Sequence, residues 1–397
     1  MTVDTERARS HWPQARRVAA IEPFHVMVLL ARARELEAAG RSIIHMEIGE
    51  PDFTTPEPIR AAATRAIAQG KIFYTPALGM PALRRAIAGF YLSRYGVEVA
   101  AERIIVTPGA SGALLLAMAA LVNPDDEVLL ADPGYPANRH FVELMNGKPV
   151  AVAVGPDSNY QLQCAHLQQH WGRRTVAALV ATPSNPTGTL LAPNELGAMA
   201  QFAAERGGVL MVDEIYHGLV YAGIAQTALA VRDDVFVINS FSKYFNMTGW
   251  RLGWMVAPAR YVSAIDRLAQ NFFLSAPTPA QYGALAALEP ATLALLDARC
   301  DEFRARRDYL LPALRELGFV VPQLPQGAFY IYANCAAFTD DSFAFARTLL
   351  EEAGVAIAPG VDFGAHEAAA HVRFAYTQPI ALLREGVARI AKFLGSK

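Results

Sequence analysis

The sequence predicts an α/β fold in which a mostly parallel, seven-stranded sheet lies between helices, with a smaller α+β domain built from both ends of the chain. Two observations carry this prediction. Seven short runs, most of them almost continuously apolar, lie between residues 103 and 257, and this pattern is typical of strands covered on both faces. Longer amphipathic or apolar runs separate them, and after about residue 281 the pattern shifts toward longer helical segments.

The composition favours a large buried core and excludes several classes of protein. Of the 397 residues, 53% are hydrophobic and 18% are charged, which excludes disorder for most of the chain. The formal net charge of −2 predicts no nucleic-acid or membrane-surface partner. Cys164, Cys300 and Cys335 are scattered, so we expect no disulfide framework. The charged N-terminal segment lacks the apolar stretch of a signal peptide, so we expect a soluble, cytoplasmic protein.

The strand candidates of the sheet follow one another in the middle of the chain. They are Arg103–Thr107, Glu127–Ala131, Pro149–Val154, Thr175–Thr182, Gly208–Asp213, Val235–Ser240 and Leu252–Ala257. The clearest helices between them are Ser111–Leu121 and Pro193–Arg206. The second of these has a proline at its start and two glycines past its end, which are common helix boundary signals.

The two ends of the chain predict the smaller domain. An amphipathic helix is expected over Phe24–Ala39, and the C-terminal part contains two helix and two strand candidates. These are the helices Ala284–Leu317 and Ser342–Ala353 and the strands Gly327–Tyr332 and His371–Ala375. We therefore expect an N-terminal arm and part of the small domain in residues 1–48, a large domain in 49–284 and a small C-terminal domain in 285–397.

Five strand candidates run directly into polar segments marked by glycine, proline or charge. RIIVT leads into PGASG, EVLLA into DPGYP, AALVAT into PSNPTG, VLMVD into EIY, and VFVINS into FSK. In open α/β sheets, ligands bind outside the carboxyl ends of the strands. Segments that are far apart in sequence are therefore expected to meet in one site.

Lys243 stands three residues past one of these strands. Most lysines are exposed, so a solvated side chain is the simpler interpretation. The neighbouring Phe241, Tyr244 and Phe245 make an apolar setting that would lower the pKa of the amine. A lysine that forms a Schiff base needs such a lowered pKa. Arg251 follows eight residues later and has the forked geometry that suits a phosphate.

Asp213 ends a strand of apolar residues. It is either a turn-capping residue or a partly buried carboxylate that needs a cation partner. Tyr216, three residues on, would place a phenol near the same ligand. Asn185 in SNPTG is either a turn asparagine or a ligand-binding amide, and Tyr135 in DPGYP is either a core residue or a flat partner for an aromatic ligand.

The PGASG turn opens an apolar helix. The backbone N–H groups of Gly109, Ala110 and Ser111 would therefore face an anion at the positive end of the helix dipole. The sequence HEAAAH offers a zinc motif only superficially. His366 and His371 are five residues apart and would fall on different faces of a helix, so we expect no metal site there.

These motifs, in this order, resemble the class I and II aminotransferases, which are pyridoxal 5'-phosphate (PLP) enzymes of the aspartate aminotransferase fold. The resemblance extends from about Ile43 to Phe374. It implies the PLP-dependent transferase fold with its large and small domains. The landmarks are IGEPDF, YTPALGMPALR, TPGASGAL, DPGYP, TPSNPTG, VDEIY, SFSKYFNMTGWRLGW and HVRFAY.

The resemblance implies a role for each candidate residue that would hold the cofactor. Lys243 would bind PLP covalently, Asp213 would pair with the ring nitrogen, and Tyr135 would stack on the ring. Tyr216 and Asn185 would hydrogen-bond the phenolic oxygen of the ring. The phosphate would lie against the start of the helix, held by Gly109, Ala110, Ser111, Ser240 and Arg251.

Three further residues take their roles from the same resemblance. Arg373 in HVRFAY would clamp the α-carboxylate of the substrate, together with the backbone of Gly49 and the side chain of Asn185. Tyr74 would reach the cofactor phosphate of a neighbouring subunit, which implies a homodimer. Catalysis would rest on Lys243, Asp213 and Tyr216, with the amine of Lys243 moving a proton at Cα of the substrate.

The implied function is the transfer of an amino group from an L-amino acid to a 2-oxo acid, by a ping-pong mechanism through pyridoxamine phosphate. Relatives that accept acidic substrates carry a second cation, in some of them a lysine where this chain has Ser111. Arg139 is one candidate substitute. Because the remaining positions expected near the substrate side chain are apolar, we expect a neutral or aromatic donor; they are Ile21, Phe24, Phe272 and Phe273.

Two alternatives remain open. Related C–S β-lyases carry the same lysine, aspartate, tyrosine and arginine set, and the sequence does not separate elimination from transamination. A PLP-binding transcription regulator is disfavoured, because only about 40 residues precede IGEPDF and the balanced charge predicts no basic DNA-binding face.

Overall fold

The computed structural model describes residues 15, 17–18, 21, 23–221 and 225–395. The first part of the arm expected in residues 1–48 therefore lies outside the described residues. The α-helices of the described part are α1 His25–Ala38, α2 Glu57–Ala68, α3 Pro81–Tyr95, α4 Gly109–Leu121, α5 Ala137–Leu144, α6 Cys164–His170, α7 Pro193–Glu205, α8 Ala259–Phe272, α9 Thr278–Ala287, α10 Pro290–Glu316, α11 Ser342–Ala353 and α12 Ile380–Gly395.

The strands of the described part form two sheets. A seven-stranded sheet has the order β2-β8-β7-β6-β5-β3-β4, and a four-stranded sheet has the order β1-β10-β11-β9. The strands are β1 Ile44–Met46, β2 Ile104–Thr107, β3 Glu127–Asp132, β4 Lys148–Ala153, β5 Thr175–Ala181, β6 Val209–Asp213, β7 Phe236–Ser240, β8 Gly253–Val256, β9 Tyr330–Asn334, β10 Val355–Pro359 and β11 His371–Ala375.

The larger sheet is mostly parallel, as expected from its apolar strands. The pairs β4/β3, β3/β5, β5/β6 and β6/β7 are parallel, and β8 alone runs antiparallel to both of its neighbours. The prediction of a mostly parallel, seven-stranded sheet is therefore confirmed. The carboxyl ends of β3, β5, β6 and β7 lie along one edge, so the polar segments that follow these strands meet there.

Helices cover both faces of this sheet, which explains why its strands are apolar on both sides. In β6, Val209 and Met211 belong to one buried cluster, and Leu210 and Val212 belong to another. Alternate residues of a strand point to opposite faces, so these clusters fill opposite sides of the sheet. Helix α4 contributes to the first cluster and α7 to the second.

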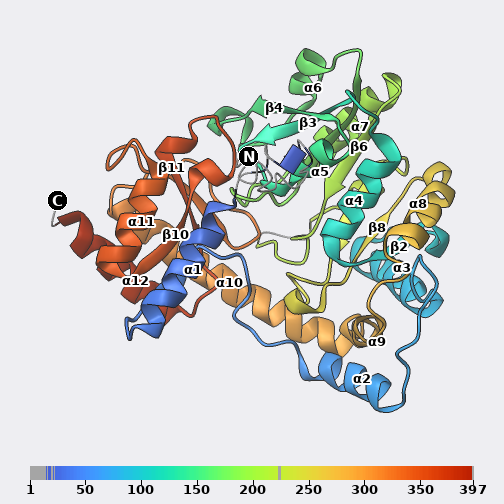
Figure 1. Cartoon of the computed structure of the whole chain (residues 1–397), viewed down its shortest axis with the longest axis horizontal. Helices are drawn as coiled ribbons and strands as arrows, with labels where there is room; N and C mark the ends of the chain where they lie inside the picture. Colours follow the sequence, from blue (N-terminus) through green and yellow to red (C-terminus); the bar gives the residue numbers. More distant parts are fainter. Residues whose placement is uncertain (1–14, 16, 19–20, 22, 222–224, 396–397) are drawn as a thin grey trace, which may run out of the picture.

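The smaller sheet joins a segment near the start of the chain to the C-terminal part. Strand β1 pairs in parallel with β10, and β11 lies antiparallel between β10 and β9. In Figure 1 the long helix α10 runs from this region to α9 and α2 beneath the large sheet. The domain boundaries at residues 48 and 284 stay predictions.

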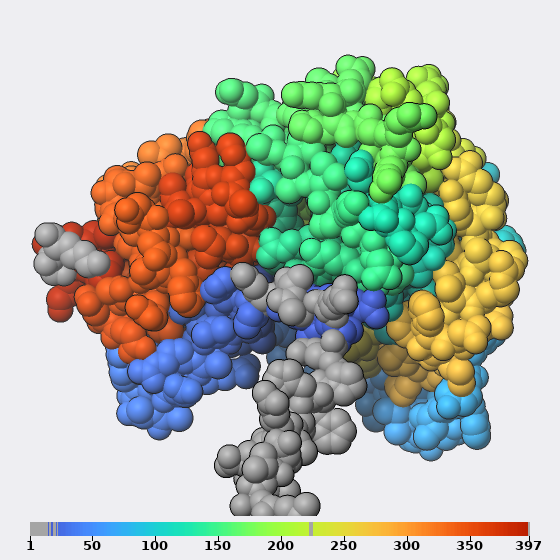
Figure 2. Space-filling view, turned by 45° about the horizontal axis from the view of Figure 1, so that its top comes forward, coloured from blue at the N-terminus to red at the C-terminus, as the bar shows by residue number. Residues whose placement is uncertain are grey.

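The C-terminal part packs directly against the large sheet, and Figure 2 shows its orange and red segments in contact with the green ones. One contact explains how the two parts are joined at this seam. The buried carboxylate of Asp132, the last residue of β3, accepts hydrogen bonds from the backbone N–H groups of Ala365 and His366. Within the described ranges, no helix has the length and apolar character needed to span a membrane.

Two expected elements differ from the structure. The single helix expected over Ala284–Leu317 is wrong at its start, because α9 ends at Ala287 and α10 begins at Pro290. Proline lacks the N–H that would continue a helix and pushes the residue before it into an extended conformation, which Glu289 adopts. The strand expected over Gly327–Tyr332 begins later, at the first residue of β9, because Ala328 has a positive φ of 58°.

Candidate active site

A cavity of about 250 Å³ lies where the segments after β1, β6 and β7 meet the start of α4. Most of the predicted site residues line this cavity. They are Gly49, Ala110, Ser111, Tyr135, Asn185, Asp213, Tyr216, Lys243, Arg251 and Arg373. The structure thus brings together residues from both sheets, at the carboxyl edge where the strand-end motifs predicted a site.

Lys243 lies in the turn after β7, and its amine points to the backbone that follows β1. Its Nζ donates a hydrogen bond to the carbonyl oxygen of Gly49 over 2.7 Å. Burial, together with the nearby Arg373 guanidinium, lowers the pKa of the Lys243 amine to about 8. An ordinary lysine titrates near 10.4, so a much larger fraction of this amine is unprotonated and nucleophilic at neutral pH.

Asp213 is the last residue of β6 and is only 7% exposed. Its Oδ1 accepts a hydrogen bond from the backbone N–H of Ile215 over 3.0 Å. Burial raises the pKa of Asp213 to about 6, and this hydrogen bond and the charge of Lys243 oppose the rise. A cationic ring nitrogen beside this carboxylate would stabilise its ionised form.

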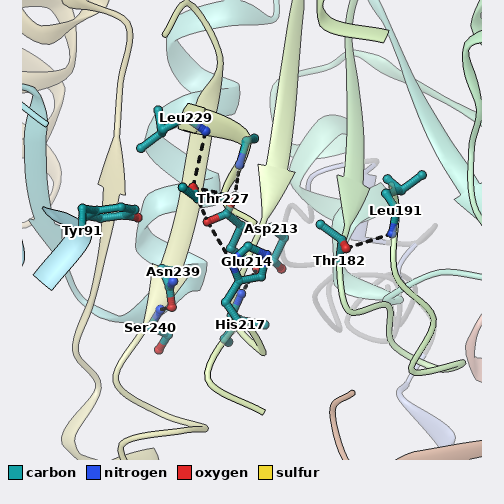
Figure 3. A network of polar contacts seen from close by, with 12 residues as sticks. Tyr91, Thr182, Leu191, Asp213, Glu214, His217, Thr227, Leu229, Asn239 and Ser240 are labelled. Atoms are coloured by element: carbon teal, nitrogen blue, oxygen red, sulfur yellow. Dashed lines mark hydrogen bonds and ion pairs between the residues drawn. The ribbon is translucent and has the colours of Figure 1, made fainter. Parts of the chain in front are cut away.

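A buried polar network lies behind Asp213 (Figure 3). Glu214 is fully buried and accepts hydrogen bonds from the backbone N–H of Ala228 and the hydroxyl of Thr227, while His217 Nδ1 lies 3.3 Å from its Oε2. Burial raises the pKa of Glu214 and lowers the pKa of His217. Burial therefore disfavours the charged form of each side chain in this closely spaced pair.

Arg373, in β11, is 3% exposed and is held by hydrogen bonds and by aromatic rings. Its Nη1 donates to Asn185 Oδ1 over 2.9 Å, and its Nη2 donates to the carbonyl oxygen of Glu47 over 2.6 Å. The guanidinium carbon lies 4.1 Å from the ring centre of Tyr330 and 4.7 Å from that of Phe363. These contacts fix the plane of a fork that can bind a carboxylate through two hydrogen bonds.

The start of α4 and Arg251 form a site for an anion on the wall of the same cavity. Gly109 has a φ of +73°, and a Cβ there would lie 2.9 Å from Nη2 of Arg251, so the glycine lets the guanidinium approach the helix. Arg251 Nη1 donates to the carbonyl oxygen of Thr248. Backbone N–H groups at the helix start and this cation would together hold a phosphate.

Ser240 lies behind the cavity wall rather than on it. Its Oγ lies 2.7 Å from Oγ of Ser242 and donates to the carbonyl oxygen of Leu252 over 3.1 Å. Ser242 lines the cavity instead, one residue before Lys243. The resemblance implied Ser240 as the serine at the phosphate, and that role stays a prediction, because Ser242 is the serine of the SFSK motif that lines the cavity.

Two predicted tyrosines differ in where they lie. Tyr135 lines the cavity and is 36% exposed, whereas Tyr74 is 80% exposed and does not line the cavity of its own chain. Among the positions expected near the substrate side chain, Phe24 lines the cavity, and the other three do not. Arg139 lines a neighbouring cavity of about 360 Å³, which shares Tyr135 and Asn185 with the first.

Comparison with known proteins identifies the family of this chain. Residues 41–390 match the family model described as aminotransferase class I and II. The chain belongs to the class I and II aminotransferases. It is 38% identical to the valine–pyruvate aminotransferase of Mycobacterium tuberculosis, over 96% of this chain and 98% of that one. It is 35% identical to the aspartate/prephenate aminotransferase of Thermus thermophilus, with 96% and 98% covered.

The solved structures agree with this assignment. A crystal structure of an aminotransferase from Mycobacterium tuberculosis superposes with a TM-score of 0.93 at 37% identity, covering 97% of this chain and all of that one. The expected fold, the expected cofactor class and the expected enzyme class are therefore confirmed. This aminotransferase belongs to a PLP-dependent family whose substrates are amino acids and 2-oxo acids.

The residues of this aminotransferase fit PLP. The cofactor has an aldehyde, a ring nitrogen and a phosphate, and the cavity offers a matching group for each. Lys243 supplies an amine of lowered pKa, and Asp213 supplies a buried carboxylate without a cation bonded to it in the described residues. Arg251 and the start of α4 supply the anion site.

Several cavity residues of the aminotransferase were missed by the sequence analysis. Tyr330 and Glu47 are buried and contact Arg373, and the apolar side chains of Val26, Met27 and Leu114 form part of the wall. Tyr330 lies in a strand candidate, GAFYIY, where nothing separates it from other core aromatics. The remaining residues come from helices or from the short β1 segment, whose patterns indicate burial and not a ligand.

Proposed function

We propose that this aminotransferase transfers the amino group of a neutral L-amino acid to a 2-oxo acid in two half-reactions of a ping-pong cycle. The observation that carries the proposal is the shared cavity of Lys243, Asp213 and Arg373. Lys243, which follows the larger sheet's β7, and Arg373, in β11 of the smaller sheet, can therefore act on the same amino acid.

The roles of the cofactor-binding residues follow from their positions. When bound, PLP supplies an aldehyde that bonds covalently to amines and a ring that accepts electrons. Lys243 would hold it covalently, and Asp213 would keep the ring nitrogen protonated. Tyr216 and Asn185 would donate hydrogen bonds to the ring oxygen, with Tyr135 against the ring face. The phosphate would contact Ala110, Ser111 and Arg251, with Gly109 at the helix start, and Ser240 would act on it through its contact with Ser242, which lines the cavity.

The chemistry at the substrate rests on two side chains. The Arg373 fork would bind the α-carboxylate, with the backbone of Gly49 at its side, and so orient the Cα–H bond. With its amine free, Lys243 would take the proton from Cα of the substrate and deliver it to the carbon that was the aldehyde carbon of the cofactor. A base with a pKa of about 8 can both accept and donate a proton near neutral pH.

A neutral donor is supported by the cavity wall. Within the described residues, the cations on this wall are Lys243, Arg251 and Arg373, and each already has a role in holding cofactor or α-carboxylate. The wall elsewhere carries apolar side chains, among them Val26 and Leu114. The Mycobacterium tuberculosis relative, named as a valine–pyruvate aminotransferase, also has a neutral donor in its name.

We also propose that the aminotransferase is a homodimer in which Tyr74 reaches the cofactor phosphate of the partner subunit. Its 80% exposure and the exposed Phe73 beside it support an apolar contact surface. Tyr74→Phe would then weaken PLP binding. Analytical ultracentrifugation tests the dimer itself, and a monomer at assay concentrations would contradict it. The cytoplasmic location stays a prediction.

The test is an absorbance spectrum of the purified protein with added PLP, before and after single amino acids. Valine, phenylalanine and aspartate form the first panel. We expect a yellow band that neutral amino acids bleach, with formation of the 2-oxo acid and without release of ammonia. Lys243→Ala should lack the covalently bound form, and Lys71→Ala, at an exposed lysine, should behave as the wild type.

Other outcomes would overturn parts of the proposal. Pyruvate and ammonia released from a cysteine conjugate, in place of transamination, would assign a C–S β-lyase. Turnover of aspartate in strong preference to valine and phenylalanine would reject the neutral donor while leaving transamination in place.

A further inference from the structure

Tyr330 contacts three of the residues that the proposed function uses. It is the first residue of β9, lines the cavity and is 2% exposed. Its hydroxyl lies 2.9 Å from the hydroxyl of Tyr216, and its ring centre lies 4.1 Å from the guanidinium carbon of Arg373. A Cβ on Gly49 would lie 1.8 Å from the Tyr330 hydroxyl oxygen, so the glycine leaves the space that the phenol fills.

The hydrogen bond between the two phenols has a direction that matters. Each hydroxyl has one proton, and within the described residues each bonds only to the other. If Tyr330 donates, the proton of Tyr216 stays free to point at a third group in the cavity. If Tyr216 donates instead, its proton is used within the pair and its lone pairs face the cavity.

The charge of Arg373 favours donation by Tyr330. A cation over the ring stabilises the negative charge that grows on the phenol oxygen as it donates. Burial raises the pKa of Tyr330, and the Arg373 guanidinium opposes this rise. Arg373 also opposes the rise at Tyr216, but burial still holds the pKa of Tyr216 well above the usual value, so Tyr216 remains protonated and keeps a proton to donate.

We propose that Tyr330 is a positioning residue that couples the substrate clamp to the cofactor. Its hydroxyl donates to Tyr216 and so directs the Tyr216 proton to the ring oxygen of PLP, and its ring braces Arg373 for the substrate carboxylate. This inference rests on the proposed function, because it assigns Tyr216 and Arg373 the roles given there. It adds a residue that neither the motifs nor the family assignment singled out.

The measurement is the pH midpoint of the visible absorption band of the PLP-loaded enzyme. A hydrogen bond to the ring oxygen stabilises its anionic form, so losing that bond raises the midpoint. Tyr216→Phe removes the bond and should raise the midpoint by about 1–2 pH units, the worth of one hydrogen bond to a charged group. Tyr330→Phe keeps the hydrogen bond from Tyr216 to the ring oxygen but weakens it. The midpoint should therefore rise by only a few tenths of a pH unit.

A double-variant cycle separates coupling from a general effect on the site. Because Tyr330 acts through Tyr216, the shift caused by Tyr330→Phe should disappear when Tyr216 is already Phe. Tyr332→Phe is the matched control. Tyr332 is a buried tyrosine on the same strand, its hydroxyl has no hydrogen-bond partner in the described residues, and it should leave the midpoint unchanged.

The ring and the hydroxyl of Tyr330 are distinguished by the substrate. Tyr330→Phe keeps a ring under Arg373, so KM for the amino acid should stay within about twofold. Tyr330→Leu removes the ring and should raise KM by about two- to thirtyfold, the range of a cation–π contact. Fluorotyrosine in place of Tyr330 is a stronger donor and should lower the spectral midpoint, which tests the coupling without removing any contact.

The outcomes for the inference differ from those for the proposed function. If Tyr216→Phe moves the midpoint but Tyr330→Phe and fluorotyrosine do not, the inference is wrong and the function stands. Additive shifts in the double variant would also reject it. If the wild-type protein shows no PLP band, or amino acids do not change it, then the proposed function itself fails.

Discussion

The amine of Lys243 donates a hydrogen bond to the carbonyl oxygen of Gly49 over 2.7 Å. Lys243 follows β7 of the seven-stranded sheet, and Gly49 follows β1 of the four-stranded sheet. The bond therefore spans the seam between the two sheets, inside the cavity. A covalent bond between a cofactor and this amine would take the place of the hydrogen bond to Gly49. Cofactor binding would therefore remove one contact between the two sheets.

The lowered pKa of Lys243 predicts selective labelling in the apoprotein. Only an unprotonated amine reacts with an acylating reagent, so labelling should increase as the pH rises through about 8, the pKa that burial gives this residue. Peptide mass spectrometry after pulsed labelling would follow it. Lys71, an exposed lysine, is the internal control, and a Lys243 profile that coincides with that of Lys71 would contradict the prediction.

Replacing the fork of Arg373 should weaken the use of every substrate. Arg373→Lys keeps the charge but loses the paired hydrogen bonds to a carboxylate, so kcat/KM should fall about 10- to 150-fold for both amino acids and 2-oxo acids. Steady-state kinetics for each half-reaction measure this. Arg347→Lys, at an exposed position of α11, should change neither, and equal losses in both variants would reject the assignment.

A cation placed at the start of α4 should change the choice of donor. Ser111 lines the cavity, so Ser111→Lys would bring an ammonium group to its rim and raise kcat/KM for aspartate roughly fivefold, which is ~1 kcal/mol. The rate with valine should not rise. Ser263→Lys adds the same charge on the exposed surface of α8 and serves as control. An equal gain in the control would point to a long-range charge effect and not to a local contact.

The first turn of α1 depends on one buried carboxylate. Asp362 accepts hydrogen bonds from the backbone N–H groups of His25 and Val26, each over 2.8 Å. Asp362→Ala should cost about 1–2 kcal/mol of stability, as the loss of a helix cap does, and lower the Tm by a few degrees. KM should rise too, because α1 carries Val26 and Met27 into the cavity wall.

Thermal denaturation of the PLP-loaded enzyme measures the change in Tm, and steady-state kinetics measure the change in KM. Asp340→Ala, at an exposed aspartate, is the matched control. An unchanged Tm in Asp362→Ala would show that α1 is held by its apolar face alone.

Much of the site could be predicted because its residues follow strands of one parallel sheet. Asp213 directly ends β6, and Lys243 stands three residues past β7, so local pattern sufficed to place both at the same edge. The helix boundary at Pro290 has a local cause in the proline, although the apolar periodicity that continues on either side favours one helix.

The sequence by itself determined the chemistry of the site: which amine, carboxylate and guanidinium are present, and that strand ends bring the first two together. Only the tertiary structure decided which side chains complete the cavity. Tyr330, Glu47 and Val26 reach it because β1, β9, β10 and β11 pair over hundreds of residues and α1 packs on them. Such long-range pairing has no local signature, since a tyrosine in an apolar strand looks the same whether it faces the core or a ligand.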